Sequence, residues 1–172
     1  MAIKRIKQFY IGLKSIFKPI KEEEVEFCKS HLSTVEYNIF DSSYKYDKKH
    51  SIRVAKSVQK LSMERNLNNK EVNLLVKSAL LHDVGKINSR ITIIDRIALV
   101  LLNKILGEKI KESNFKKVIV YYNHPEMSYN MLKNKINDEK LLYIIKNHHN
   151  NINSCDRYKE ELSILIKCDE DN

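Results

Sequence analysis

The chain has 172 residues, of which 42% are hydrophobic and 31% are charged, and its formal net charge is +9. This length fits one globular domain with a core of its own, and the composition is typical of such a domain. The longest unbroken apolar run, residues 97–102, is much shorter than the ~20 residues of a membrane span, so no segment is expected to cross a bilayer. The positive charge attracts anions but does not say which kind.

The first predicted helix covers residues 2–17, where apolar side chains recur every three or four positions between basic ones. Pro19 is expected to end it. The segment lacks the continuous apolar stretch of a secretory signal, so we expect a cytoplasmic protein. We expect this helix to pack against the rest of the fold. The alternative is peripheral contact with an anionic membrane, which its lysines would favour.

Hydrophobic periodicity predicts further helices along the rest of the chain, and residues that commonly cap helices precede several of them. The predicted caps are Asn69, Ser89, Asn114 and Asn137, and Pro125 is expected to separate two helices because the residue before a proline disfavours helix. With 3 Gly and 2 Pro and no alternating strand pattern, the fold class is predicted to be all-α. The predicted helices cover 21–31, 33–40, 44–64, 69–82, 91–106, 114–123, 125–134, 138–149 and 156–170.

Seven side chains of the types that bind metals fall on the apolar, inward-facing stripes of these helices. An unpaired carboxylate or imidazole buried there would cost free energy, so something must compensate these groups. Taken singly, each histidine could be buried and hydrogen-bonded to a backbone carbonyl, but one shared site for divalent metal accounts for all seven. The seven are His50, His82, Asp83, His124, His148, His149 and Asp169.

Several of these side chains are predicted to lie at or just beyond helix C-termini, because Gly85 follows the His-Asp doublet, Asn150 follows the His-His doublet and Pro125 follows a histidine. The partial negative charge of a helix C-terminus suits a cation. Neighbours on a regular helix point ~100° apart, so a doublet serves one metal site best where the helix ends, or else bridges two ions. His31, the sixth histidine, lies outside this pattern.

The three cysteines, Cys28, Cys155 and Cys168, are odd in number and form no C-x-x-C pair. They therefore indicate neither a disulfide framework nor a zinc ribbon. We interpret them as core or incidental thiols.

The order of His50, the doublet His82-Asp83 and Asp169 resembles the H…HD…D pattern that defines the HD superfamily of metal-dependent phosphohydrolases. The stretch "HDVGK" is similar to the HDIG variant, and the resemblance covers about residues 44–170. The leading segment, with "RIKQFY" and "FKPI", is also similar to the start of small stand-alone HDIG proteins of bacteria.

The resemblance implies an all-α HD-domain helical bundle with a central metal site. It implies one HD domain over residues 1–172, with 1–43 as an N-terminal helical extension and 44–172 as the metal-binding core. His124 in "HPEMSYN" and the doublet in "IIKNHHN" resemble the extra ligands of the two-metal branch, which includes the HD-GYP phosphodiesterases.

The sequence departs from the better-known branches in three ways. No G-Y-P follows His149, which speaks against cyclic dinucleotides as substrates, and Tyr46 stands where trinuclear HD-GYP members carry a glutamate, which speaks against a third metal. Only three residues follow Asp169, so the last helix is expected to be short or the chain trimmed.

The cofactors implied are two divalent ions, with iron or manganese expected and zinc, nickel, cobalt or magnesium as alternatives. The resemblance implies His50, His82, Asp83 and Asp169 on one ion and Asp83, His124, His148 and His149 on the other. Asp83 would bridge the ions, and a hydroxide held between them would attack phosphorus. Lys86, the second expected catalytic residue, would supply charge to the phosphoryl oxygens, unless it is an ordinary solvated loop lysine.

The expected partner is a phosphorylated small molecule, a nucleotide by preference, and no nucleic acid is expected. Arg53 is a candidate for a second phosphate, with an ordinary surface arginine as the alternative, and Tyr122 or its neighbour Tyr121 is a candidate for stacking on a base. The expected activity is hydrolysis of a phosphate ester or anhydride of a nucleotide-like substrate. A cyclic-dinucleotide phosphodiesterase and a non-catalytic, metal-stabilised signalling or binding module stay open as alternatives.

Overall fold

The computed structural model describes residues 19–150, 152 and 157–172, which fold as helices without any strand. This confirms the all-α prediction, whereas the predicted helix at 2–17 lies outside the described residues. None of the described helices has the length and apolar character to span a membrane. The elements are α2 Glu22–His31, α3 Thr34–Asp41, α4 Lys45–Glu64, α5 Asn69–Leu81, η1 Val84–Asn88, α6 Ile93–Leu106, η2 Gly107–Glu112, α7 Lys116–Leu132, α8 Glu139–Asn147 and α9 Lys159–Asp171.

Three of the four predicted helix starts follow the predicted chemistry, at a neighbouring residue, whereas the predicted cap Asn114 is wrong because α7 begins after Phe115 without a side-chain cap. Asn68, one residue before the predicted cap, accepts a hydrogen bond from the backbone N–H of Glu71 and begins α5. Thr92 caps α6 in the same way, three residues after the predicted Ser89, and Asp138 caps α8. A side-chain oxygen that satisfies a free N–H of the first turn works from any of these neighbouring positions, which is why the pattern located the start only to within a few residues.

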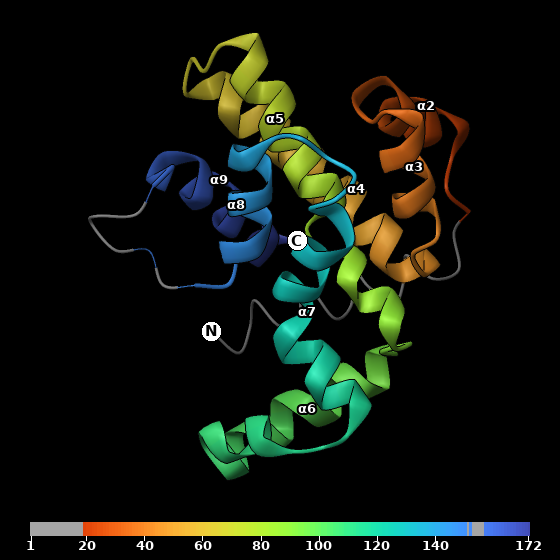
Figure 1. Ribbon diagram of the computed structural model, residues 1–172, viewed down its shortest axis with the longest axis vertical. Coiled ribbons are helices and arrows are strands. Elements are labelled where there is room, and N and C mark those ends of the chain that lie inside the picture. The colour runs from red at the N-terminus through yellow and green to blue at the C-terminus, as the bar shows by residue number, and fades with distance from the viewer. Residues whose placement is uncertain (1–18, 151, 153–156) are drawn as a thin grey trace.

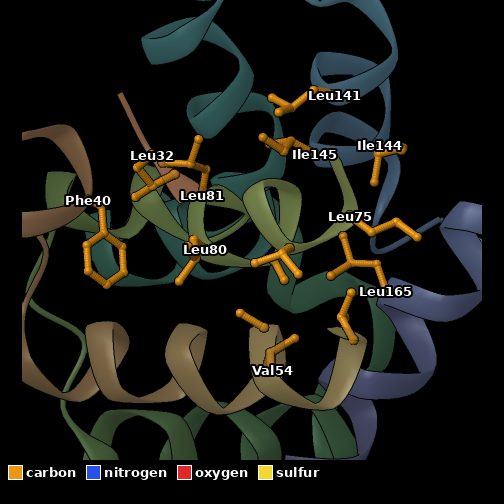
Figure 2. Close-up of a cluster of buried hydrophobic side chains, with 14 of the residues drawn as sticks. Leu32, Phe40, Val54, Leu75, Leu80, Leu81, Leu141, Ile144, Ile145 and Leu165 are labelled. Atoms are coloured by element: carbon orange, nitrogen blue, oxygen red, sulfur yellow. The ribbon is translucent and has the colours of Figure 1, made fainter. Parts of the chain in front are cut away.

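The core of the bundle lies between α4 and α5, with α8 and α9 packed against them (Figure 2). Val54 of α4, Leu75 and Leu80 of α5, and Leu165 of α9 are fully buried in this core. The N-terminal helices α2 and α3 belong to it too, since Cys28 of α2 and Phe40 of α3 lie in the same hydrophobic cluster. The segment predicted as an extension therefore shares one core with the remainder of the chain over residues 22–41.

The cysteines that the structure describes are core residues. The thiols of Cys28 and Cys168 are both free and buried. Burial raises the pKa of Cys28 to about 12 and that of Cys168 to about 11, so both stay protonated at neutral pH. Cys155 lies outside the described residues.

Helix α6 and the 3₁₀ helix η2 stand apart from this core, at the lower end of the view in Figure 1. They pack with the first half of α7 around a second, smaller cluster. The buried residues of that cluster are Ile91, Leu99, Ile110, Val118 and Val120. The molecule thus has a main bundle and a smaller lobe, and α7 runs through both (Figure 1).

The prediction of two helices separated by Pro125 is wrong, because α7 is one helix with the proline inside it. A proline has no N–H to donate to the carbonyl four residues earlier, which here belongs to Tyr121. Nδ1 of His124 lies 2.8 Å from that carbonyl oxygen and donates to it instead. The carbonyl of Tyr121 therefore keeps a hydrogen-bond partner although the proline provides none, and His124 lies in the middle of a helix and not at its end.

Candidate metal centre

The structure brings all seven predicted ligand residues together where α4, α7 and α9 meet the C-terminal ends of α5 and α8. His82 and His148 directly follow α5 and α8, so the two doublets do lie at helix ends as predicted. Ligand atoms within 4.8 Å of one another form three overlapping groups. The groups are His50, His82 and Asp83; His82, His148 and Asp169; and His124, His148 and His149.

Asp83 lies between two sets of histidines. Its Oδ2 is 3.5 Å from Nε2 of His82 and 3.8 Å from Nε2 of His50. Its Oδ1 points the other way and is 3.1 Å from Nε2 of His124. A carboxylate whose two oxygens face different imidazoles has the arrangement needed to bind two cations at once.

Asp169 closes the other side of the site. Its Oδ1 is 2.8 Å from Nε2 of His50 and 3.6 Å from Nε2 of His82, and its Oδ2 is 4.0 Å from Nε2 of His149. His149 is the most exposed of the histidines in the cluster, with 52% of its side chain accessible, whereas His82 is fully buried. The site is therefore deep at His82 and open at His149.

Three of the imidazoles are held by the same backbone device. In each case Nδ1 lies within hydrogen-bond distance of the carbonyl oxygen three residues earlier, at 2.8 Å, 2.8 Å and 2.6 Å. A carbonyl only accepts, so Nδ1 must carry a proton, and in the neutral ring Nε2 then presents a lone pair. The pairs are His82 with Ala79, His124 with Tyr121 and His148 with Ile145.

These lone pairs find no hydrogen-bond donor in the described part of the chain. Nε2 of His82, His124 and His148 and Oδ1 of Asp83 are buried without a hydrogen-bond partner. Across the 3.1 Å between His124 and Asp83, two electron-rich atoms face each other. Buried acceptors left in this way cost free energy unless a cation lies between them, so the donor set fits a metal.

The protonation states suit metal binding as well. Burial, with the charge of Lys86, lowers the pKa of His124 to about 4, and burial lowers that of His148 well below its usual range. Burial alone would raise the pKa of Asp83, but His82 and Lys86 lower it well below the usual range. His82 differs from the other two rings, because burial would lower its pKa but the carboxylates of Asp83 and Asp169 raise it, so a bound cation would take the place of its second proton. Neutral imidazoles and an ionised carboxylate are the forms that bind a divalent metal.

Lys86 is buried beside Asp83 and is not a solvated loop lysine. Directly after the His-Asp doublet the chain turns into η1, which brings residues three apart over one another. The Nζ atom of Lys86 consequently lies 2.5 Å from Oδ2 of Asp83. The site thus holds a cationic side chain that the protein itself supplies.

A bond between η1 and α7, unforeseen from the sequence, sets the spacing of the site. The hydroxyl of Ser128 accepts from the backbone N–H of Gly85 at 2.9 Å and donates to the carbonyl of His82 at 2.7 Å. A Cβ atom at Gly85 would lie 2.5 Å from the carbonyl oxygen of His124. Only glycine at position 85 allows this close approach of η1 to α7. In the sequence, the one sign of the hydrogen bond was that Ser128 stands four residues after His124.

The interactions of Arg53 and Tyr122 are with residues outside the set of seven ligand residues. The Nε and Nη2 atoms of Arg53 are buried without a hydrogen-bond partner, and the charges that act on its guanidinium come from Tyr46 and Glu24. Tyr122 packs against the smaller lobe, with Nζ of Lys111 5.6 Å from its ring centre. The substrate-binding roles of both side chains stay predictions.

A second cation near the site, Arg96 of α6, was also missed. Its Nη2 lies 2.5 Å from Oδ1 of buried Asp47, and its guanidinium carbon lies 4.7 Å from the ring centre of Tyr46. Burial would lower the pKa of Arg96, but Asp47, Tyr46 and Asp83 together raise it. In the sequence, the position of Asp47 one turn before His50 was a sign that it lies near the site. Nothing in the sequence pairs Asp47 with Arg96, a residue 49 positions later.

Comparison with known proteins agrees with this geometry. The profile of the HD domain family matches residues 48–169, from just before His50 to Asp169, and the chain therefore belongs to the HD domain family. HD domains form a superfamily of metal-dependent phosphohydrolases, and they bind divalent metals. No curated protein and no solved structure matches the chain.

Proposed function

We propose that the protein is a two-metal phosphohydrolase that cleaves a phosphate ester or anhydride of a nucleotide-like small molecule. The observation that carries this proposal is the position of Asp83, whose two oxygens face two different sets of histidines 3.1 Å and 3.5 Å away. A site for one ion needs no carboxylate that reaches in both directions.

The proposed ligand sets divide the seven residues around Asp83. His50, His82 and Asp169 face its Oδ2 side, and His124, with the doublet at 148–149, faces its Oδ1 side. Imidazole with carboxylate suits borderline ions, of which iron or manganese is our preference. When bound, such ions lower the pKa of a shared water molecule and polarise phosphoryl oxygens.

The two cations that the chain supplies have separate proposed tasks. Lys86 meets the phosphoryl group that is attacked, because its Nζ lies beside Asp83 and stays fixed while negative charge develops on the phosphoryl oxygens. Arg96 binds a further phosphate of the substrate, since its Nε is buried without a hydrogen-bond partner and its Nη2 pairs with Asp47, one turn before His50. A planar guanidinium suits such a group, because it offers two parallel donors.

Metal analysis with a hydrolysis screen tests the proposal. Protein purified without chelator and reconstituted anaerobically with iron or manganese should contain close to two ions per chain. It should hydrolyse members of a panel of nucleoside mono-, di- and polyphosphates, cyclic dinucleotides and dinucleoside polyphosphates. A chain that binds no transition metal after reconstitution, or a metal-loaded chain inactive on the whole panel, would contradict the proposal.

A further inference from the structure

The exposed apolar surface of the described chain is concentrated on one helix. Of the ten large hydrophobic side chains that are exposed there, six lie on the 14-residue helix α6 and a seventh, Phe115, just before α7. We call the six the α6 patch. They are Ile94, Ile97, Leu101, Leu102, Ile105 and Leu106.

The patch is too large to be incidental. Ile94 and Ile105, one near each end of the helix, are 77% and 78% exposed. Together with Phe115 the patch offers apolar surface on the order of several hundred Å² per chain, the scale of the ~800 Å² that each partner buries in a standard protein interface. A groove lined by Leu102 and Phe115 runs along its edge, so the surface is hollowed and not flat. Exposed apolar surface of this extent marks an interaction site.

The order of residues on α6 matches a second copy of the same helix. Ile94, Ala98, Leu101 and Ile105 follow the alternating spacing of four and three that forms the seam of a coiled coil. This seam is symmetric about the midpoint between Leu99 and Val100. When two copies pack antiparallel, Ile94 meets Ile105 of the other copy and Ala98 meets Leu101, so every layer is filled. The small side chain at 98 lets the two helices approach closely.

The composition of the seam on α6 favours a second copy of the chain over a membrane as its partner. The seam contains no charged residue, so anionic lipid would find cations only at its edges. A face that complements itself about a two-fold axis produces closed dimers. Leu99, on the opposite side of α6, is buried in the smaller lobe, so α6 can present the seam without leaving its own chain.

We propose that the α6 patch is the interface of a two-fold symmetric homodimer, formed by antiparallel packing of α6 against α6 of the partner. This inference goes beyond the proposed function and does not depend on it. Because each chain carries a net charge of +9, the two copies repel one another at long range, and salt that screens this repulsion should strengthen the dimer.

Sedimentation equilibrium of the full chain, at several concentrations and two salt concentrations, tests the proposal. The wild type should be a dimer that tightens with salt. Leu101→Glu should raise the dissociation constant by about 100-fold or more, because it buries two unpaired carboxylates at the centre of the interface. Met63→Glu is the matched control, since Met63 is 56% exposed on α4 and should leave the dimer unchanged. Circular dichroism checks that each variant is folded.

A disulfide experiment tests the register independently of any loss of folding. In a chain with Cys155→Ser, the double variant Ala98→Cys and Leu101→Cys should form a covalent dimer on mild oxidation, whereas Met63→Cys should not. A monomeric wild type would overturn the proposal. A dimer that tolerates Leu101→Glu would also overturn it. A monomer that binds anionic vesicles, more weakly as salt is added, would identify a membrane as the partner of the patch. A dimer that appears only when residues 2–17 are deleted would identify that segment as its partner.

Discussion

The ammonium group of Lys86 lies 2.5 Å from Oδ2 of Asp83, the carboxylate oxygen that also faces His82 and His50. Both residues of this pair are buried, and the turn of η1 holds them three positions apart. The lysine therefore touches the carboxylate on the same side as one set of imidazoles. A positive charge in this place can serve the substrate without replacing any of the seven ligand residues.

Lys86→Ala should separate the role of the lysine from that of the ligands. We expect metal content to stay nearly unchanged and turnover to fall by ~10²–10³-fold, the usual effect of removing one charge partner of the transition state. Elemental analysis and initial rates on the substrate found in the screen measure the two quantities. Lys60→Ala is the control, because Lys60 lies exposed on α4. A parallel loss of metal would show that Lys86 supports the site and not the substrate.

Asp83→Asn should lose most of the metal and the activity together. The substitution keeps the shape of the side chain but replaces an ionised oxygen by an amide, which is a far weaker ligand for a divalent ion. His31→Ala serves as the control, because His31 lies outside the cluster of ligands. Its ring packs on Phe27, and its Nδ1 donates a hydrogen bond to the carbonyl of Phe27 in its own helix. Full metal content and full hydrolysis in Asp83→Asn would rule out the bridging role.

Gly85→Ala should destabilise the protein and weaken metal binding. The new Cβ would lie 2.5 Å from the carbonyl oxygen of His124 and 2.6 Å from the backbone nitrogen of Ser128. Backbone atoms cannot rotate away, so α7 must shift, at a cost of about 1–3 kcal/mol in the free energy of unfolding. Urea denaturation with and without metal measures this change in the free energy of unfolding. Ser128→Ala, which removes the bond without adding volume, should cost about 1–2 kcal/mol. Unchanged metal affinity in Gly85→Ala would show that α7 moves without disturbing His124.

The metal-free protein should lose stability as the pH falls from about 6.5 to about 4. Burial lowers the pKa of His124 from its usual value of 6.5 to about 4 in the folded chain. Within this window the unfolded chain binds more protons than the folded one, so the free energy of unfolding decreases with decreasing pH, by about 3 kcal/mol for one such group. Denaturation at a series of pH values measures the slope. His124→Gln should reduce the slope without abolishing it, because burial lowers the pKa of His148 as well, and an equal slope in that variant would contradict this assignment.

Most of the helices could be predicted because their apolar faces repeat every three or four residues. The same stripes pointed to the ligand residues, since a histidine or aspartate on an inward face has to be compensated. The break at Pro125 was predicted wrongly because the rule applied to it, that the residue before a proline disfavours helix, states only a local preference. It does not consider that the imidazole of His124 can donate to the same carbonyl of Tyr121.

Contacts between distant segments were beyond the reach of the sequence. The pairing of Arg96 with Asp47 depends on how the smaller lobe folds back on α4, and no local pattern encodes that. The hydrogen bond from the backbone N–H of Gly85 to the hydroxyl of Ser128 depends on a close approach between η1 and α7. Both contacts are set by tertiary packing and not by the periodicity of a single helix.

The backbone device that holds His82, His124 and His148 also bears on how the protein responds to its supply of ions. Each ring is oriented by a carbonyl of its own chain turn, at 2.6–2.8 Å, so its direction does not depend on what the other nitrogen binds. An ion can therefore leave and another enter without refolding of the bundle. If the proposed function holds, a chelator is therefore expected to remove the metal and the activity reversibly and to leave the bundle folded, which circular dichroism before and after chelation would check.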